Sequence, residues 1–385
     1  MSKVTMIGCD LHDCSMLLKV AVDRGKPVKK TFQTSDAAEM IEWLKEFARR
    51  HDSVRIVFAY EASGMGFGLH DDLTEAGIEC HVLAPTHLPH TTHRRKNKTD
   101  EKDAEMILEE VRASVLAGRK LPAVWVPDPE TRDDREPLRL RLSLARQRTQ
   151  IKNQIRCLAK RSKLSFPVWF TNSGDWSKRS VAWLLAVAAG DEGNLLPGVR
   201  AVLAGLVELY VSFSEQLKTL DKVIGKLAKK KRYAQAFRKL KLIKGVGTLT
   251  AMVFLTELGD LNRFANRRQL AAYLGLAPSA FESGECDDRK GRITRQGPSQ
   301  VRHVLCQAAW TAVRCTDKWK DTYERVKRGT QKRGKVAIVA VMRKLAITMW
   351  HAARSQELDE LLDEFDEIKA DQQNQQPADR KRKAA

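Results

Sequence analysis

The first 127 residues alternate between the two-residue apolar period of strands and the longer apolar period of helices. We predict strands at residues 4–10, 15–22, 28–33, 54–60 and 79–84, with helices at 36–50, 67–76 and 100–116. Strands interleaved with helices in this order are typical of an α/β fold. The pattern therefore predicts an α/β domain over residues 1–127.

Residues 128–240 follow the helical period almost throughout. One apolar series lies among Arg and Lys, at Leu144, Ile151, Ile155 and Leu158. A second series alternates steps of three and four, at Leu206, Leu209, Phe213, Leu217, Leu220, Ile224 and Leu227. Such spacing is typical of a coiled coil, whose helices pair either within one chain or between protomers. We favour dimerisation for this region.

Three further segments complete the chain. Trp169, Trp176 and Trp183 predict a less regular insert between the two helical series. Residues 241–356 predict a second compact and mostly helical domain. Residues 357–385 predict an acidic helix followed by a disordered basic tail, because this stretch has few apolar residues to bury.

The charge of the chain indicates a polyanionic partner. Its 68 Lys and Arg residues exceed its 48 Asp and Glu residues, which gives a net charge of +20. This excess favours nucleic acid or an anionic surface. No apolar run approaches the ~20 residues of a membrane span, and the first residues lack the apolar core of a secretory signal. We therefore expect a cytoplasmic, nucleoid-associated protein with no membrane contact, and its seven cysteines, which form no C-x-x-C pair, are expected to be reduced.

Four carboxylates stand at positions where they can converge. Asp10 and Glu61 follow two apolar runs that predict strands, and the carboxyl ends of strands in α/β sheets form the edge where ligands bind. Asp100 and Asp103 open a predicted helix, and their spacing of three places them on one helix face. The order Asp-Glu-Asp-Asp thus combines two strand ends with one helix start.

Crowded carboxylates repel one another unless a cation neutralises them. Magnesium prefers oxygen ligands and often acts in pairs ~4 Å apart on phosphodiesters. Asp10, Glu61, Asp100 and Asp103 are therefore predicted to hold two Mg²⁺ ions, which Mn²⁺ could replace. The alternative for each residue alone is structural, with Asp100 as a helix cap, Asp103 facing solvent and the other two as ordinary strand ends.

Two basic or glycine-rich segments predict contacts to nucleic acid. Segment 87–98 precedes Asp100, and four of its cations would hold a strand beside the carboxylates: Arg94, Arg95, Lys96 and Lys98. Its three histidines do not predict zinc, because Pro89 breaks the helix that would align them. Segment 242–251 resembles a helix-hairpin-helix turn, in which Gly245 and Gly247 would let the backbone approach a phosphate. A plain connection between helices is the alternative.

Ser283 lies beside Gly284 in a loop that leads to four cations, Arg289, Lys290, Arg292 and Arg295. Such a serine can approach a phosphate closely. Its hydroxyl is a poor nucleophile at neutral pH and needs a base, cation or metal to activate it. A Ser-Gly pair is also common in ordinary turns, so residue chemistry alone leaves both interpretations open.

Several segments together resemble the IS110 family of insertion-sequence transposases, over about residues 4–350. They are residues 7–10, 60–64, 98–104, 274–278, 283–284 and 290–297. The resemblance implies an RNase H-like, RuvC-like first domain with a metal-binding tetrad formed by Asp10, Glu61, Asp100 and Asp103. It also implies a C-terminal transposase domain in which Ser283 is the covalent nucleophile.

The same resemblance implies Mg²⁺-dependent cleavage and exchange of donor and target DNA through a phosphoserine intermediate. It further implies a structured guide RNA from the element, a homodimer or tetramer, and a composite site, since the tetrad and Ser283 are in separate domains. The family often has Ser-Gly-Gly where this chain has Ser283-Gly284-Glu285, so Ser279 is a rival nucleophile. The alternatives are a RuvC-like junction nuclease that uses water, and a DNA-binding protein without catalysis.

Overall fold

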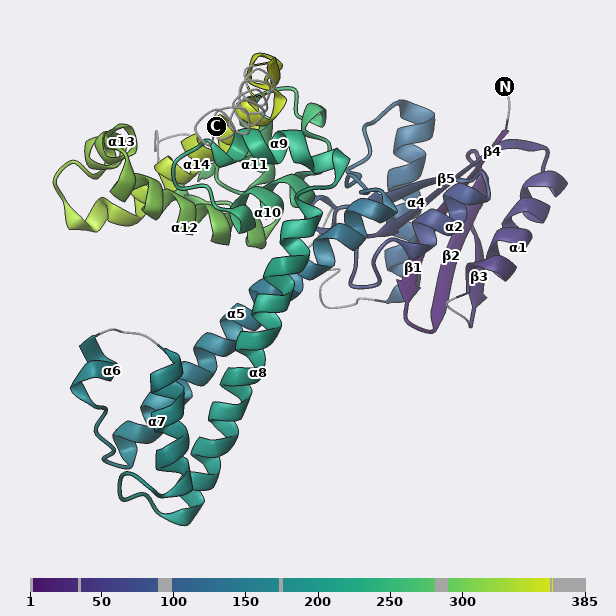
Figure 1. Ribbon diagram of the computed structural model, residues 1–385. Coiled ribbons are helices and arrows are strands. Elements are labelled where there is room, and N and C mark those ends of the chain that lie inside the picture. Colours follow the sequence, from purple (N-terminus) through teal and green to yellow (C-terminus); the bar gives the residue numbers. More distant parts are fainter. Residues whose placement is uncertain are drawn as a thin grey trace, which may run out of the picture. The chain divides into compact units, whose positions relative to one another are not determined.

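The computed structural model describes residues 3–33, 36–88, 99–172, 176–280, 290–360 and 362. The chain separates into two compact units, Met1–Pro127 and Asp128–Ala385, here the first and second unit. Figure 1 follows their elements along the sequence. The predicted division of the chain into four parts stays a prediction.

The first unit is built on one five-stranded sheet. Its strands are β1 (Lys3–His12), β2 (Ser15–Val22), β3 (Val28–Phe32), β4 (Ser53–Glu61) and β5 (Glu79–Leu83), in the order β3-β2-β1-β4-β5. β1 pairs antiparallel with β2 and β2 with β3, whereas β1 and β4, and β4 and β5, run parallel. The five strands lie within two residues of the predicted ranges, so the expected α/β pattern is confirmed.

Three helices cover the two faces of this sheet. They are α1 (Ala37–Arg50), α2 (Gly68–Glu75) and α4 (Asp100–Ala117), each close to its predicted range. Residues of β1 alternate between the faces, so that Ile7 packs with Met40 of α1 and Met6 with Ile107 of α4. The sheet is therefore buried on both sides. Every second residue of β1, counted from Met6, lies on the face that α4 covers.

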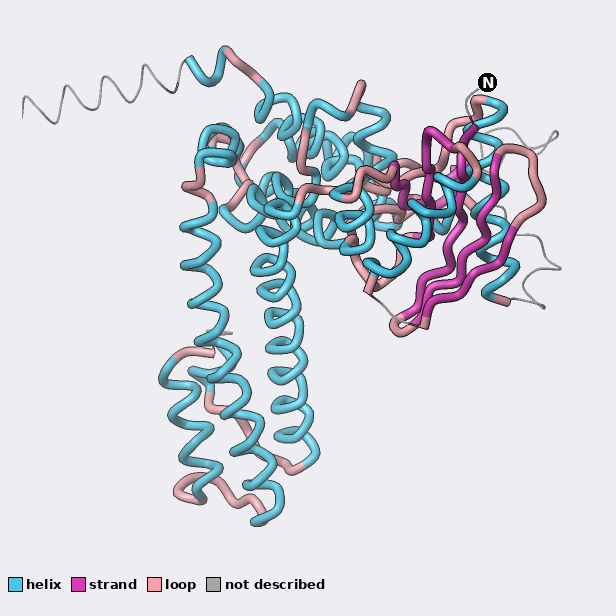
Figure 2. Tube along the Cα trace, turned by 90° about the vertical axis from the view of Figure 1, so that its right-hand side faces the viewer, coloured by secondary structure: helices cyan, strands magenta, loops and turns pink. Residues whose placement is uncertain are grey.

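The second unit begins with a long helical hairpin. Its elements are α5 (Pro129–Arg161), α6 (Val168–Asn172), α7 (Lys178–Ala189), α8 (Pro197–Leu227) and α9 (Lys231–Lys241). Helices α5 and α8 pack against each other within the chain, and Figure 2 shows them running side by side. α6 and α7 belong to the predicted insert and lie at the far end of the hairpin (Figure 1). The two predicted apolar series lie in α5 and α8, and dimerisation stays a prediction.

Helices form most of the remainder of the second unit. They are α10 (Thr248–Leu258), α11 (Arg267–Tyr273), α12 (Ser299–Cys315), α13 (Asp317–Lys327) and α14 (Gly334–Arg354), with a short hairpin of β6 (Pro278–Ala280) and β7 (Lys290–Ile293). Every residue of α10 from Thr250 to Leu258 is buried. α10 packs in one core with α12 and α14, and the base of α8 joins the same core through Ile224.

A buried charge network fixes α5 to α10. Arg135 Nε donates to the carbonyl oxygen of Thr256 at 2.9 Å, and its Nη2 donates to that of Glu257 at 3.0 Å. The Glu257 carboxylate, only 7% exposed, accepts from Arg139 Nε at 2.9 Å. Burial lowers the pKa of Arg135, while hydrogen bonding to Glu257 raises that of Arg139. The carboxylate thus compensates two guanidinium groups at the base of the hairpin.

One described helix of the second unit is long and apolar. Among the described residues, one helix, Gln331–Arg354, is long and apolar enough to cross a membrane by length and composition alone. Arg343 and Lys344 divide this stretch, so no continuous apolar run marks it in the sequence. Its side chains, including Val341 and Leu345, pack into the core of the second unit, as those of a central helix do.

Candidate active site

Two of the predicted carboxylates stand on neighbouring strands. β1 and β4 run parallel with Cys9 opposite Tyr60, so Asp10 and Glu61 follow at adjacent positions on the two strands. Asp10 shares the strand face of Met6, which packs with α4, and Glu61 shares that of Ala59. The strand topology therefore brings residues fifty positions apart to one edge of the sheet, on the side that α4 covers.

The end of β1 differs from the sequence-based expectation. The apolar run stops at Cys9, but the strand continues to His12, because Leu11 and His12 pair with Met16 and Ser15 across a tight hairpin. Asp10 therefore lies inside the strand, and its carboxylate is held on a regular backbone. The side chain of Asp10 is 19% exposed, which leaves one side open to a ligand.

Helix α4 brings the other two aspartates to this edge. Thr99 caps the helix by accepting from the backbone N–H of Lys102, and Asp100 and Asp103 occupy the first turn. Glu101, between them, accepts from Lys19 Nζ at 2.6 Å and from Lys29 Nζ at 2.8 Å. These two ion pairs fix the start of α4 to β2 and β3 and lower the pKa of Glu101 to about 2.

Gly8 determines how closely α4 approaches the sheet. A Cβ atom at this position would collide with the carbonyl oxygen of Ala104 and with the backbone of Leu108. The backbones of β1 and α4 are therefore in direct contact two residues before Asp10. At Gly8 no side chain lies between the strand that carries Asp10 and the helix that carries Asp100, and only glycine allows this.

Three side chains form a close group at the edge: Asp10, His12 and Asp100. Their candidate ligand atoms all lie within 4.8 Å of one another. His12 Nε2 lies 3.1 Å from Asp10 Oδ2 and 3.6 Å from Asp100 Oδ2. We did not predict His12, although its two-residue spacing from Asp10 places it on the same strand face. Glu61 and Asp103 lie outside this 4.8 Å group.

The electrostatics of Asp10 suit a cation. Burial raises the pKa of its carboxyl, His12 lowers it, and the negative charges of Asp100 and Asp103 raise it further. The ionised carboxylates thus oppose one another, and a divalent cation would remove that cost. Carboxylate oxygens are the protein ligands that Mg²⁺ and Mn²⁺ prefer. The residues present therefore fit the predicted metal.

Several predicted nucleic-acid contacts lie outside the described residues. They are Arg94, Arg95, Lys96 and Lys98 before α4, and Arg289 before β7. Arg292 and Arg295 are described and exposed, and Arg295 has a φ of 57°. Lys290 begins β7. The roles of all these residues stay predictions.

The two glycines of the predicted phosphate-binding turn have different surroundings. Gly245 has a φ of 94°, and an added Cβ would lie 2.7 Å from the carbonyl oxygen of Ala308 in α12. Packing within the core therefore requires a glycine at position 245. Gly247 is exposed at the N-terminus of α10, and nothing lies within 4 Å of an added Cβ there. Gly247 is the one of the two whose surroundings leave room for a phosphate.

Of the two candidate serines, Ser279 lies within the described residues and Ser283 does not. Ser279 lies in β6, and its hydroxyl donates to the carbonyl oxygen of Arg292 in β7 at 2.8 Å. Its hydrogen bond therefore closes the hairpin. Ser283 falls in segment 281–289 between β6 and β7, outside the described residues.

Arg302 fixes the base of this hairpin, a role that the sequence did not reveal. Its Nη1 donates to the carbonyl oxygens of Leu274 at 3.2 Å, Gln296 at 2.8 Å and Gly297 at 3.0 Å. These acceptors come from the chain before β6 and after β7. One guanidinium on α12 thus holds together both ends of the segment that contains Ser283.

Comparison with known proteins gives matches over both units. A DEDD transposase model of the IS110 type matches residues 7–162, and the model of the transposase IS116/IS110/IS902 family matches residues 237–324. The first range contains the four carboxylates, and the second contains Ser283. A DEDD transposase match supports an RNase H-like fold for the first unit.

Individual relatives agree with these family matches. The putative transposase y4rJ of Sinorhizobium fredii is 30% identical over 75% of this chain and 75% of its own length. The putative transposase y4qE of the same organism is 30% identical over 66% of this chain, which spans only 58% of that relative. The transposase for insertion sequence element IS1111A of Coxiella burnetii is 28% identical over 62% of this chain and 60% of its own length.

Proposed function

The chain belongs to the IS110 family of DNA transposases, and we propose that it cuts and rejoins DNA strands through a covalent phosphoserine intermediate. The observation that carries this proposal is the approach of Asp10 and Asp100 at the edge of the sheet, within a group of ligand atoms no more than 4.8 Å apart. Carboxylates in this arrangement suit phosphodiester chemistry. The runner-up functions are hydrolysis of DNA junctions by water and DNA binding without catalysis.

We propose that Asp10, Glu61, Asp100 and Asp103 hold two Mg²⁺ ions, or Mn²⁺ in their place. The raised pKa of Asp10 and the fit of the donor set support this assignment. When bound, the cations would polarise the scissile phosphate and offset the charge that develops on it. The protein's own part is positional: β1 holds Asp10, contact at Gly8 places α4, and His12 orients the Asp10 carboxylate.

Ser283 is the proposed nucleophile. Its Oγ would form a bond to phosphorus while the bond from phosphorus to one DNA oxygen breaks, and the hydroxyl proton would pass to a base while that oxygen gains one. The phosphoserine would conserve the bond energy, so the hydroxyl of a second strand could reverse the step. The hydrogen bond of Ser279 to Arg292 supports Ser283 over its rival, because Ser279 already closes the hairpin.

The proposed partners are donor DNA, target DNA and a structured guide RNA from the element, with a homodimer or tetramer as the working form. The net charge of +20 supports partners of high negative charge. We expect the protein to act in the cytoplasm, on the nucleoid. These assignments rest on membership of the family.

An adduct assay tests the mechanism. The protein is incubated with Mg²⁺ and DNA that contains the ends of its element, denatured, and examined for covalently attached DNA. We expect an adduct for wild type and for the matched control Ser279→Ala, and none for Ser283→Ala or Asp10→Asn. An adduct that survives in Ser283→Ala would exclude the proposed nucleophile.

The same assay separates the alternative functions. Free nicked DNA without any adduct, in wild type and Ser283→Ala alike, would support hydrolysis by water. Intact DNA under all conditions, with binding retained, would support the DNA-binding role. Loss of cleavage in Asp10→Asn is expected to be on the order of 10³-fold, since metal-ion catalysis contributes several kcal/mol.

A further inference from the structure

Helix α5 of the second unit carries a stripe of positive charge. Between Glu136 and Asp175 the sequence has nine Lys and Arg residues and no Asp or Glu. Four of these recur at intervals of four: Arg148, Lys152, Arg156 and Lys160. Residues so spaced lie on one helix face, about 6 Å apart along the axis. Like charges in such a row repel one another, so the stripe favours a ligand with regularly spaced negative charge.

One end of this basic stripe meets a pocket of about 610 Å³ between α5, α7 and α8. Arg148, Lys178 and Lys218 line the pocket, and among the described residues no carboxylate forms an ion pair with any of them. Arg141, a fourth cation of the lining, is already paired with Asp221 at 3.0 Å. Glu215 is the other lining carboxylate, so positive charge exceeds negative charge in the pocket.

Two buried donors in the lining of this pocket have no acceptor among the residues that the structure describes. Within the described part of the chain, neither Arg148 Nε nor Trp176 Nε1 has a hydrogen-bond partner. Buried N–H groups are normally paired, because leaving them unpaired costs free energy. The N-terminus of α7, capped by Ser177, lies at the same wall and adds the positive end of a helix dipole. Donors, charge and dipole all favour an anion such as a phosphate.

Aromatic rings adjoin the basic side chains. The Trp176 and Tyr210 rings lie 4.9 Å apart, and Lys152 Nζ lies 5.4 Å from the centre of the Trp176 ring. Tyr210 Oη donates to the carbonyl oxygen of Trp176 at 3.1 Å, which fixes the segment before α7 to α8. Aromatic rings interleaved with cations are typical of sites that bind single-stranded nucleic acid.

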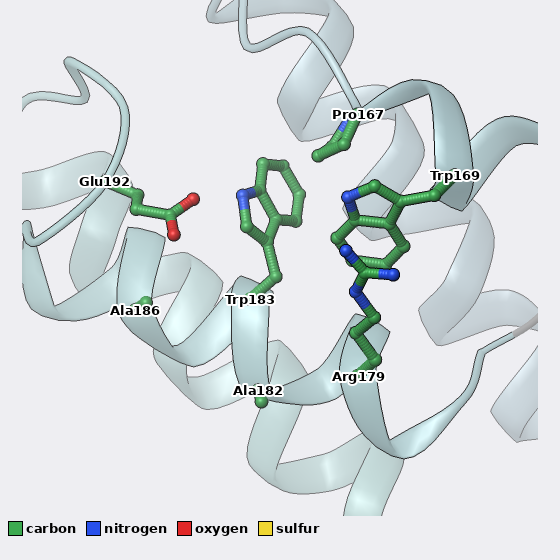
Figure 3. Close-up of a pocket in the computed structure, with 7 residues that line it drawn as sticks. All are labelled: Pro167, Trp169, Arg179, Ala182, Trp183, Ala186 and Glu192. Carbon is green, nitrogen blue, oxygen red and sulfur yellow. The ribbon is translucent and has the colours of Figure 1, made fainter.

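A second, smaller pocket lies beside the first on α7. Its volume is about 400 Å³, and Ala182 lines both pockets. In Figure 3 the Trp183 ring stands between Glu192 and Trp169, and the Arg179 guanidinium lies against the Trp169 ring, 4.2 Å from its centre. An indole face beside a carboxylate can stack an unpaired base and accept a hydrogen bond from its exocyclic amine.

We propose that the basic stripe and the larger pocket bind the phosphodiester backbone of a single-stranded nucleic acid, and that Trp183 in the smaller pocket stacks one unpaired base. The insert at the far end of the hairpin is then a nucleic-acid site of its own. The charged and hydrogen-bonding groups of the pocket favour a phosphate. The assignment of this phosphate to a nucleic acid rests on the proposed function. The same chemistry accepts RNA and DNA, so the test compares both.

The test measures binding without cleavage. Full-length Asp10→Asn protein in metal-free buffer is titrated into labelled single-stranded RNA, single-stranded DNA and duplex DNA at several salt concentrations. Arg148→Gln is compared with Arg146→Gln, a matched control on the same helix, two residues away on a different face. Because no strand is cut, the result does not depend on whether Ser283 acts as a nucleophile.

We expect Arg148→Gln to weaken single-strand binding about tenfold, as loss of a charge-assisted hydrogen bond does. The slope of log affinity against log salt should shrink by about 0.7, the value for one phosphate contact on a single strand. Arg146→Gln should change the affinity less than about twofold. Equal losses in the two variants would overturn the site, because general charge would then explain the binding, and so would no loss in either.

The Trp183 variants test whether this side chain contributes to binding of single strands but not of duplexes. Trp183→Leu should weaken single-strand binding about tenfold and leave duplex binding unchanged, whereas Trp183→Phe, which keeps an aromatic face, should retain both. Thermal melting of the variants shows whether the insert remains folded. Equal losses on duplex and single strand, or full binding by Trp183→Leu, would overturn base stacking. The strand on which Arg148→Gln has the larger effect identifies the partner as RNA or DNA.

Discussion

Helix α4 in the first unit and helix α5 in the second both position functional side chains, but they are attached to their cores in different ways. α4 rests directly on the backbone of β1 at Gly8, and its ion pairs, from Glu101 to Lys19 and Lys29, lie nearer the surface. α5 is held by the buried carboxylate of Glu257 and two arginines. The attachment of α4 is therefore sensitive to any atom added at Gly8, whereas that of α5 is sensitive to loss of the charge of Glu257.

The largest effect is expected from loss of the buried carboxylate. Glu257→Gln would remove the buried carboxylate that pairs with Arg135 and Arg139, and removing one partner of a buried ion pair costs about 3–5 kcal/mol. Urea unfolding of the second unit measures this loss. Glu136→Gln is the matched control, because Glu136 pairs with the same Arg139 but is 69% exposed. A similar effect in both variants would show that burial of Glu257 is not what matters.

The next effect tests the steric attachment. Gly8→Ala should destabilise the first unit by about 1–3 kcal/mol, the usual cost of overpacking. It should also reduce the rate of DNA cleavage by more than the loss of folded protein explains, because α4 would move Asp100 away from Asp10. Gly68→Ala in α2 is the control, since an added Cβ there meets nothing within 4 Å. Melting temperature and cleavage rate are measured for both, and equal behaviour would refute the proposed contact.

A smaller effect of opposite sign is expected at Asp10. Folding raises the pKa of this carboxyl, so its ionised form opposes the fold. That cost is absent below the ordinary carboxyl pKa and grows as the pH rises through the raised value. Asp10→Asn should therefore melt at a higher temperature than wild type at pH 7 but not at pH 3. Mg²⁺ should stabilise wild type and not the variant, and a metal response that persists in Asp10→Asn would argue against this ligand.

The smallest effect is expected at Glu101. Its pKa is lowered to about 2, so its stabilising ion pairs are complete above the ordinary glutamate pKa and are lost as the pH falls toward 2. The melting temperature of Glu101→Gln should lie slightly below that of wild type at pH 7, and the difference should disappear near pH 2. A difference that does not change with pH would assign the effect to packing.

Periodicity predicted the elements of the first unit well, because each strand buries an apolar face and each helix an apolar stripe. The four carboxylates were also visible in the sequence, since each follows or begins such an element. The direct contact at Gly8 was not, because a glycine in a strand does not reveal which backbone lies against it. His12 was missed because the apolar run ends before the strand does.

In the second unit, the sequence did not predict which distant elements pack together. Heptad spacing predicted the long helices but not their partners, and α5 and α8 pair within the chain. Gly245 was interpreted as part of a phosphate-binding turn, whereas packing against α12 already requires a glycine there. Such contacts join residues about sixty positions apart, and local patterns carry no information about them.

The length of α5 gives the hairpin a mechanical property. Its 33 residues span about 50 Å, and the buried charges that fix it lie near one end. A tilt of about 5° at this pivot would displace the far end by about 4 Å, by the geometry of a rigid helix of that length. A small rotation of α5 at Arg135 and Glu257 therefore moves the insert by a large distance. A ligand bound to the insert can in turn apply a torque to the core of the second unit through Arg135 and Glu257.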